Sequence, residues 1–217
     1  MKKLLVGLMM VAMGLLLMSP VASAYSISAG DSIVLTIGIG NAVNGGGAFN
    51  VDKVGDSQGV LFDTFCLERN EDFYNGQTLY VGGVTGGAIN GGYSGGNPDP
   101  ISSQTAYLYY QWETYAITHT TVNANDLQLA IWSLEGEMAV DPITLTDGAQ
   151  AFIDSAANAD GFYGVQVMNL YDTYSNGVYS GNAQDQLVYN AVPESATMLL
   201  LGLGLIGLAG VRRKFQK

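Results

Sequence analysis

The chain of 217 residues ends in a segment with three distinct parts. Val192-Pro193-Glu194-Ser195 favours a turn, an uncharged apolar run fills residues 196–211, and Arg212-Arg213-Lys214 follows it. The run is slightly shorter than the roughly 17–25 residues of a membrane-spanning helix, but flanking basic side chains can reach the bilayer surface. Basic residues after the run predict a cytoplasmic end. We therefore expect a single transmembrane helix at 196–211, within a terminal segment 191–217.

This tail resembles the PEP-CTERM sorting signal of Gram-negative bacteria that produce exopolysaccharide. Pro193, Glu194, Arg212 and Arg213 carry the resemblance, whereas Ser195 stands where the signal usually has a second proline. The resemblance implies that an exosortase, a membrane cysteine protease, cuts near Pro193-Glu194. The C-terminal helix would then hold the chain in the membrane only before processing. The mature protein is expected to be secreted or associated with the cell envelope or extracellular matrix.

The first 24 residues have the three parts of a cleaved secretory signal peptide. Lys2-Lys3 precede an apolar stretch at residues 4–18, and Ala22-Ser23-Ala24 supplies the small residues of a cleavage site. Cleavage is expected before Tyr25. Residues 25–190 then form one extracytoplasmic domain, of ordinary size for a single hydrophobic core.

The charge of this body restricts its partners. It contains 18 of the 19 acidic residues but only two basic ones, Lys53 and Arg69. Such an acidic surface does not favour nucleic acid as a partner. Cys66 is the only cysteine, so the chain has no internal disulfide framework. Nothing in the sequence points to a cofactor.

The hydrophobic pattern predicts an α+β fold. Apolar and polar residues alternate as in half-buried strands at residues 26–41, 48–54, 60–67, 165–171 and 186–189. Glycine-rich residues 82–100 are expected to form a surface loop. Helical spacing begins after Ser102 or Ser103 with Ala106, Tyr107, Tyr110 and Tyr115, and recurs near 124–135 and 147–159. We expect a β-sandwich or barrel with an inserted helical subdomain.

Two short segments stand out for their chemistry. Cys66 lies between Phe65 and Leu67 at the end of a predicted strand, and Gln128 lies beside the apolar stripe of the helix expected near 124–135. Taken alone, Cys66 is most simply a small buried apolar residue. The only histidine, His119, lies in a threonine-rich segment without a cysteine-protease pattern around it.

Together, the Phe-Cys-Leu and Leu-Gln-Leu-Ala-Ile-Trp segments resemble the thioester domains of bacterial surface adhesins. The resemblance covers about residues 62–134. It implies that the Cys66 thiol and the Gln128 amide condense to an internal thioester, which a nucleophile on a target then opens. An extracellular polysaccharide or a surface protein is the expected target. The protein is thus expected to be a covalent surface adhesin rather than an enzyme.

Two alternatives to the adhesin hypothesis remain open. The first is a non-covalent protein of the exopolysaccharide matrix or biofilm in which Cys66 is simply buried. The second is a hydrolase, but no Gly-x-Ser-x-Gly sequence or paired-carboxylate motif supports it. Acids at Glu68 and Glu71, or at Glu135 and Glu137, lack the spacing of a calcium loop, and we expect them on the solvated surface. No metal site is predicted.

Overall fold

The computed structural model describes residues 27–40, 45–89, 91–190 and 202. The body lies within one compact unit, Tyr25–Asn190. The expected signal peptide and, apart from Gly202, the expected sorting segment lie outside the described residues. In the part of the chain that is described, no helix has the length and apolar character needed to cross a membrane.

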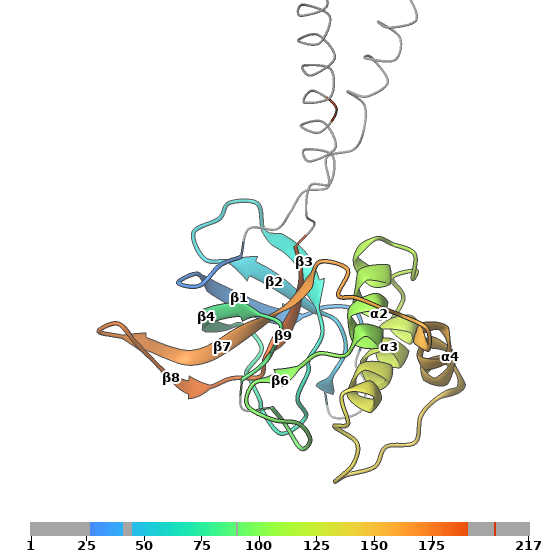
Figure 1. The fold of residues 1–217 in the computed structure, drawn as a ribbon. Helices are drawn as coiled ribbons and strands as arrows, with labels where there is room; N and C mark the ends of the chain where they lie inside the picture. The colour runs from blue at the N-terminus through green and yellow to red at the C-terminus, as the bar shows by residue number, and fades with distance from the viewer. Residues whose placement is uncertain (1–26, 41–44, 90, 191–201, 203–217) are drawn as a thin grey trace, which may run out of the picture. The chain divides into compact units, whose positions relative to one another are not determined.

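One antiparallel sheet of seven strands dominates the body (Figure 1). Its strands follow the order β3-β2-β1-β4-β7-β8, and β9 pairs with β7 as well. Two short strands, β5 and β6, form a separate pair. The strands span Ser32–Ile37 (β1), Phe49–Lys53 (β2), Val60–Thr64 (β3), Gln77–Thr85 (β4), Gly87–Ala88 (β5), Asp99–Pro100 (β6), Val165–Ser175 (β7), Val178–Asn182 (β8) and Gln186–Tyr189 (β9).

The sheet curls until its first and last parts meet at Cys66. Residues 65–67, which follow β3, lie against the start of β9 and form an isolated antiparallel bridge between Cys66 and Gln186. On either side of this bridge, Leu67 N–H donates to the Asp185 carbonyl and Leu187 N–H donates to the Phe65 carbonyl, each at 3.2 Å. The curl therefore places Cys66 beside residues more than a hundred positions later in the chain.

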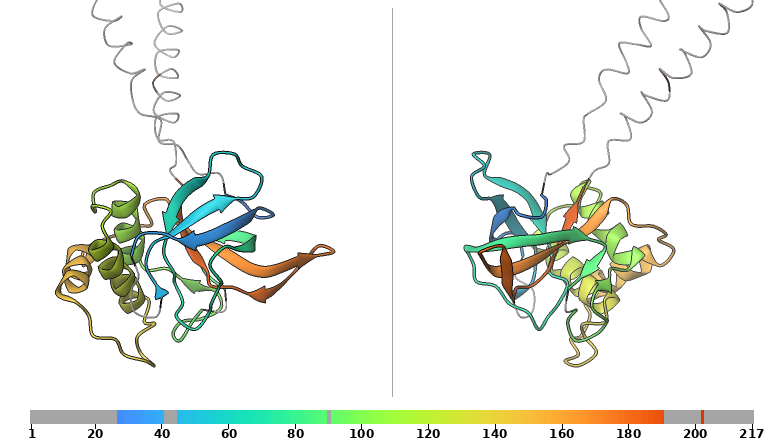
Figure 2. Two further views of the ribbon diagram at one scale, coloured as in Figure 1. Left: turned by 180° about the vertical axis from the view of Figure 1, so that it is seen from behind. Right: turned by 60° about the vertical axis from the view of Figure 1, so that its left-hand side comes forward.

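Three consecutive helices separate β6 from β7 and pack together beside the sheet (Figures 1 and 2). They are α2 (Ser103–Glu113), α3 (Thr121–Leu134) and α4 (Asp147–Ala156). Each helix is capped by the hydroxyl group of the residue before it, which accepts a hydrogen bond from the backbone N–H three residues later. The capping residues are Ser102 for α2, Thr120 for α3 and Thr146 for α4. The helical insertion expected from the sequence is confirmed, and α2 packs against β7 and β9.

Several boundaries differ from the prediction, although the α+β class is confirmed. Residues 82–85 end β4 instead of beginning a loop, and both β8 and the extension of β7 to Ser175 were missed. Tyr115 lies beyond α2 in a left-handed conformation and is exposed. Apart from the short β5–β6 pair, the described strands form one large curled sheet and not the two facing sheets of a sandwich.

The core has two parts, one inside the sheet and one between the sheet and the helices. Ile33, Leu35, Val51 and Leu79 fill the first part. The second joins the helices to the strand ends and contains Phe65, Cys66, Trp112, Leu127, Ala130, Ile131 and Trp132. Every residue of helix α3 from Asp126 to Trp132 is buried, so this segment has no solvent-exposed face. Its Gln128 therefore lies inside the second part of the core.

Candidate functional site: a buried cysteine among three glutamines

Cys66 and Gln128, the two residues selected from the sequence, meet in the core. Cys66 is 1 % exposed and Gln128 is 0 % exposed, so neither lies at the edge of its element. The Cys66 backbone N–H donates to Gln128 Oε1 at 3.1 Å, and Gln128 Nε2 donates to the Cys66 carbonyl at 2.9 Å. These paired bonds hold the Gln128 carboxamide beside the Cys66 backbone.

The segment Gly46-Gly47 covers Gln128 on another side. Gly47 N–H is a second donor to Gln128 Oε1, at 3.4 Å. A Cβ at Gly46 would lie 2.9 Å from Gln128 Cγ and would also collide with the Trp132 ring. The Gln128 carbonyl oxygen therefore receives two backbone N–H groups under a closely packed cover. Two donors aimed at one carbonyl oxygen can stabilise negative charge that develops there.

The sulfur of Cys66 contacts two glutamines that we did not single out from the sequence. Its S–H donates to Gln184 Oε1 at 2.8 Å, and Gln186 Nε2 donates to Sγ at 3.4 Å. Gln184 is 7 % exposed and Gln186 is 0 % exposed. The closely spaced glutamines in Gln184-Asp185-Gln186, at the start of the strand predicted for residues 186–189, were the signal in the sequence. Only the curl of the sheet shows that they face the cysteine.

The surroundings keep the Cys66 thiol protonated. Burial raises its pKa, the Gln186 N–H partly opposes that rise, and Glu68 and Asp72, wherever they are ionised, raise the pKa further. A buried thiol of raised pKa reacts only slowly with solutes, because the thiolate is the reactive form.

Acids next to the cysteine are also buried, contrary to the solvated surface expected for them. Glu68 is 2 % exposed, and its Oε2 accepts the Asp185 backbone N–H at 3.0 Å. Burial, with Asp185 and Glu71 nearby, raises the pKa of Glu68 to about 10. Burial and the same neighbouring Asp185 raise the pKa of Glu71 to about 7. The carboxyl group of Glu68 is therefore protonated and neutral at pH 7.

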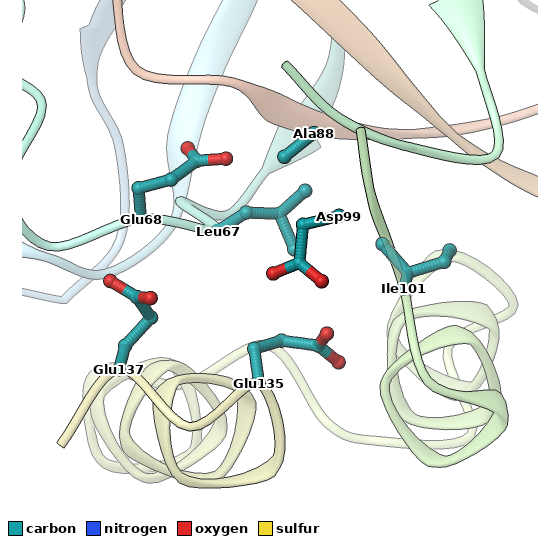
Figure 3. A pocket seen from close by; sticks show the side chains of 7 residues that line it. All are labelled: Leu67, Glu68, Ala88, Asp99, Ile101, Glu135 and Glu137. Carbon is teal, nitrogen blue, oxygen red and sulfur yellow. The ribbon is translucent and has the colours of Figure 1, made fainter. Parts of the chain in front are cut away.

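A small hollow adjoins this acidic region (Figure 3). Leu67, Glu68, Ala88, Asp99, Ile101, Glu135 and Glu137 line it. Glu137 accepts backbone N–H groups of Arg69, Tyr93 and Ser94, and Glu135 accepts both the N–H and the hydroxyl of Ser102. These two carboxylates therefore fasten loops to the end of α3. Within the described ranges, no group of three or more His, Cys, Asp or Glu side chains has the arrangement to hold a metal ion.

His119 has a separate environment. Its ring stacks on Trp112 and Tyr115, Nε2 lies 2.9 Å from the Trp112 carbonyl oxygen, and Nδ1 lies 3.6 Å from Asp63 Oδ2. These contacts join the end of α2 to β3. They do not bring the imidazole to the sulfur of Cys66, whose side-chain partners are Gln184 and Gln186.

Comparison with known proteins identifies the tail. The PEP-CTERM protein-sorting motif matches residues 191–214, which include Pro193, Glu194, Ser195, Arg212 and Arg213. This motif implies exosortase-dependent export, with association of the protein with the cell envelope or surface. It also makes an exosortase the processing partner. No curated protein and no solved structure matches the chain.

Proposed function

We propose that the exported body attaches covalently to its target through a thioester between Cys66 and Gln128. One observation carries the proposal, namely that the Gln128 carboxamide is held against Cys66 by two hydrogen bonds in a buried site. An extracellular polysaccharide or a surface protein is the target class. The protein reacts once and stays attached, so it is an adhesin and not an enzyme.

Formation of the bond needs no external reagent. Sγ attacks the Gln128 Cδ, the Sγ–Cδ bond forms, the Cδ–Nε2 bond breaks, and the thiol proton leaves with the nitrogen as ammonia. This reaction is unfavourable between free molecules in water. Holding the thiol and the carboxamide together can lower the barrier by about 7–11 kcal/mol. The N–H groups of Cys66 and Gly47 stabilise the negative charge on Oε1 in the tetrahedral intermediate.

The packing around the pair suits a reactive bond that must survive in water. Trp132 is buried one helical turn after Gln128, and the ring of Phe65 packs edge-on against Trp112 at 5.1 Å between centroids. These aromatic side chains limit the access of water to the site. A target amine or hydroxyl would attack Cδ, keep the Gln128 acyl group, and return the proton to Sγ as the thiol leaves.

A second candidate function is a non-covalent matrix protein with a buried cysteine. The contacts of the sulfur favour it, because Sγ bonds to Gln184 and Gln186 and not to Gln128. In this case, the four side chains are a buried polar cluster whose hydrogen bonds fix the end of β3 to β9 and α3.

Mass spectrometry of the full chain, purified from the producing cells, distinguishes the two functions. The adhesin is expected to lack the mass of one ammonia, to resist thiol alkylation even when unfolded, and to gain one methylamine on Gln128 when treated with that amine. Cys66→Ala and Gln128→Ala are each expected to abolish the deficit and the labelling. Gln104→Ala, on α2, is the matched control and retains both. A protein of full mass whose thiol is alkylated once the chain is unfolded would exclude the thioester and favour the matrix protein.

A further inference from the structure

The contacts of the cysteine divide between two sets of partners. Gln128 bonds to the backbone of Cys66, whereas Gln184 and Gln186 bond to its sulfur. The first set comes from α3 and the second from the chain around the start of β9. The backbone and the nucleophilic atom of Cys66 are therefore held independently.

Burial of the Gln186 amide is unfavourable for the stability of the fold. Gln186 is fully buried, and its Oε1 has no hydrogen-bond partner among the described residues. Leaving a buried amide oxygen unpaired is unfavourable, and an aliphatic side chain of similar size would avoid the cost. Its Nε2 donates to Sγ and, at 3.4 Å, to the Gln184 carbonyl. The amide is thus oriented toward the sulfur at the expense of its own oxygen.

The two glutamines have complementary effects on the thiol. Gln184 Oε1 accepts the S–H proton, and its Nε2 donates to the Glu68 carbonyl, so this amide is fixed at both ends. Gln186 supplies an N–H to the sulfur itself, and a donor at this position stabilises negative charge on Sγ. In the group of contacts made by Sγ, one partner directs the proton and the other stabilises the charge.

We infer that Gln184 and Gln186 position the Cys66 sulfur for making and breaking the thioester, an inference that rests on the proposed function. Gln184 fixes the orientation of the S–H group by accepting its hydrogen bond. As Sγ attacks Gln128 Cδ, Gln186 stabilises the charge on Sγ, and the thiol proton passes to Gln128 Nε2, which leaves as ammonia. The same N–H stabilises the departing sulfur when a target nucleophile opens the thioester. Gln184 and Gln186 are not consumed, and their amides remain intact throughout.

Substitution of Gln186 in the full chain tests this role. Gln186→Met keeps the length of the side chain without an N–H donor, and Gln186→Glu keeps its shape while adding charge. Both are expected to slow opening by methylamine about tenfold or more, the scale of one hydrogen bond to a charged atom. Gln166→Met is the matched control on β7, where Gln166 bonds to Asn190 and is only half-buried. It is expected to react at the wild-type rate.

The pH profile of the opened protein separates positioning from a merely structural role. After methylamine treatment, alkylation of the free Cys66 thiol against pH is expected to shift to higher pH in Gln186→Met and to remain unchanged in Gln166→Met. Wild-type opening rates and an unshifted profile in the Gln186 variants would overturn the inference. Peptide mapping that finds methylamine on Gln184 or Gln186 would also overturn it, since that glutamine would then be the acyl group.

The inference and the proposed function fail in different ways. A wild-type protein with full mass and a free thiol removes the thioester, and the positioning role falls with it. A wild-type protein with the ammonia deficit, but with Gln186 variants that form and open the bond normally, leaves the thioester standing and removes only the positioning role.

Discussion

Gln128 and Cys66 are 62 residues apart in the chain, yet the Gln128 carboxamide pairs with both the N–H and the carbonyl of Cys66. The pairing resembles one rung of a sheet, in which a side chain of α3 replaces a neighbouring strand. Residues 65–67 also bond to β9 on another side through Leu67 and Leu187. The backbone of Cys66 is therefore fixed by a helix and a strand together, whatever chemistry its sulfur performs.

This arrangement predicts that Gln128→Ala is more destabilising than Cys66→Ala. Removal of the carboxamide leaves the N–H and carbonyl of Cys66 buried without that partner, at a cost of about 2–4 kcal/mol. Cys66→Ala removes one small buried atom, together with its weak S–H donor to Gln184 Oε1, and costs about 1–2 kcal/mol. Chemical denaturation of the two variants measures the difference. Both variants lack any thioester, so that bond does not affect the comparison, and equal stabilities would contradict the pairing.

A second prediction concerns the cover over Gln128. Gly46→Ala places a methyl group against Gln128 Cγ and the Trp132 ring, and overpacking of this kind costs about 1–3 kcal/mol. The variant is also expected to reduce methylamine labelling, because the carboxamide must move. Gly86→Ala is the control, since a Cβ there meets no atom within 4 Å. If Gly46→Ala matched Gly86→Ala in thermal unfolding and in methylamine labelling, the segment Gly46-Gly47 would not pack closely over Gln128 in solution.

Much of the fold follows from local signals in the sequence. Alternating apolar residues predicted β1, β2 and β3. A serine at 102 or 103 predicted the start of α2, and helical spacing from residue 147 predicted the start of α4. The β7–β8 hairpin was missed although Asn176-Gly177 is a strong turn signal, and both residues have positive φ in the structure. Gly82 and Gly83 indicated a loop, but the Tyr171 ring lies over Gly82 within the sheet, where a side chain would not fit.

The candidate site was only partly predictable. The pairing of Cys66 with Gln128 was expected from two short segments, and the structure brings these residues together. The positions of Gln184 and Gln186 depend on how far the sheet curls, which is a sum of many small strand twists and has no local sequence signal. The burial of Glu68 was missed for the same reason, since Asp185 reaches it only across the bridge at Cys66.

The buried carboxyl groups predict that the protein is more stable in mild acid than in alkali. The pKa values of Glu68, Glu71 and Asp185 are all raised by burial, so the folded chain binds more protons than the unfolded chain. The free energy of unfolding is therefore expected to be highest below the ordinary carboxyl pKa of 4.5 and to fall as pH rises through about 7 and toward about 10. Denaturation at a series of pH values measures this fall.

Substitution of one of these acids isolates its part of the pH dependence. Glu68→Gln retains the shape of the protonated side chain and is expected to flatten the fall in stability at the alkaline end. Asp56→Asn, at an exposed position, removes the same charge and tests whether general repulsion explains the effect. Equal flattening by both substitutions would assign the pH dependence to net charge and not to the burial of Glu68.

The last prediction concerns the tail matched by the sorting motif. Protein recovered from the surface of the producing cells is expected to end near Glu194, because the processing protease removes the segment that follows. Mass spectrometry of the C-terminal peptide identifies the end directly. Ser195→Pro restores the usual second proline and is expected to speed processing, whereas Thr197→Pro places the proline within the apolar run and serves as a position control. Surface protein that retains Lys217 in the wild type would show that this tail is an uncleaved anchor.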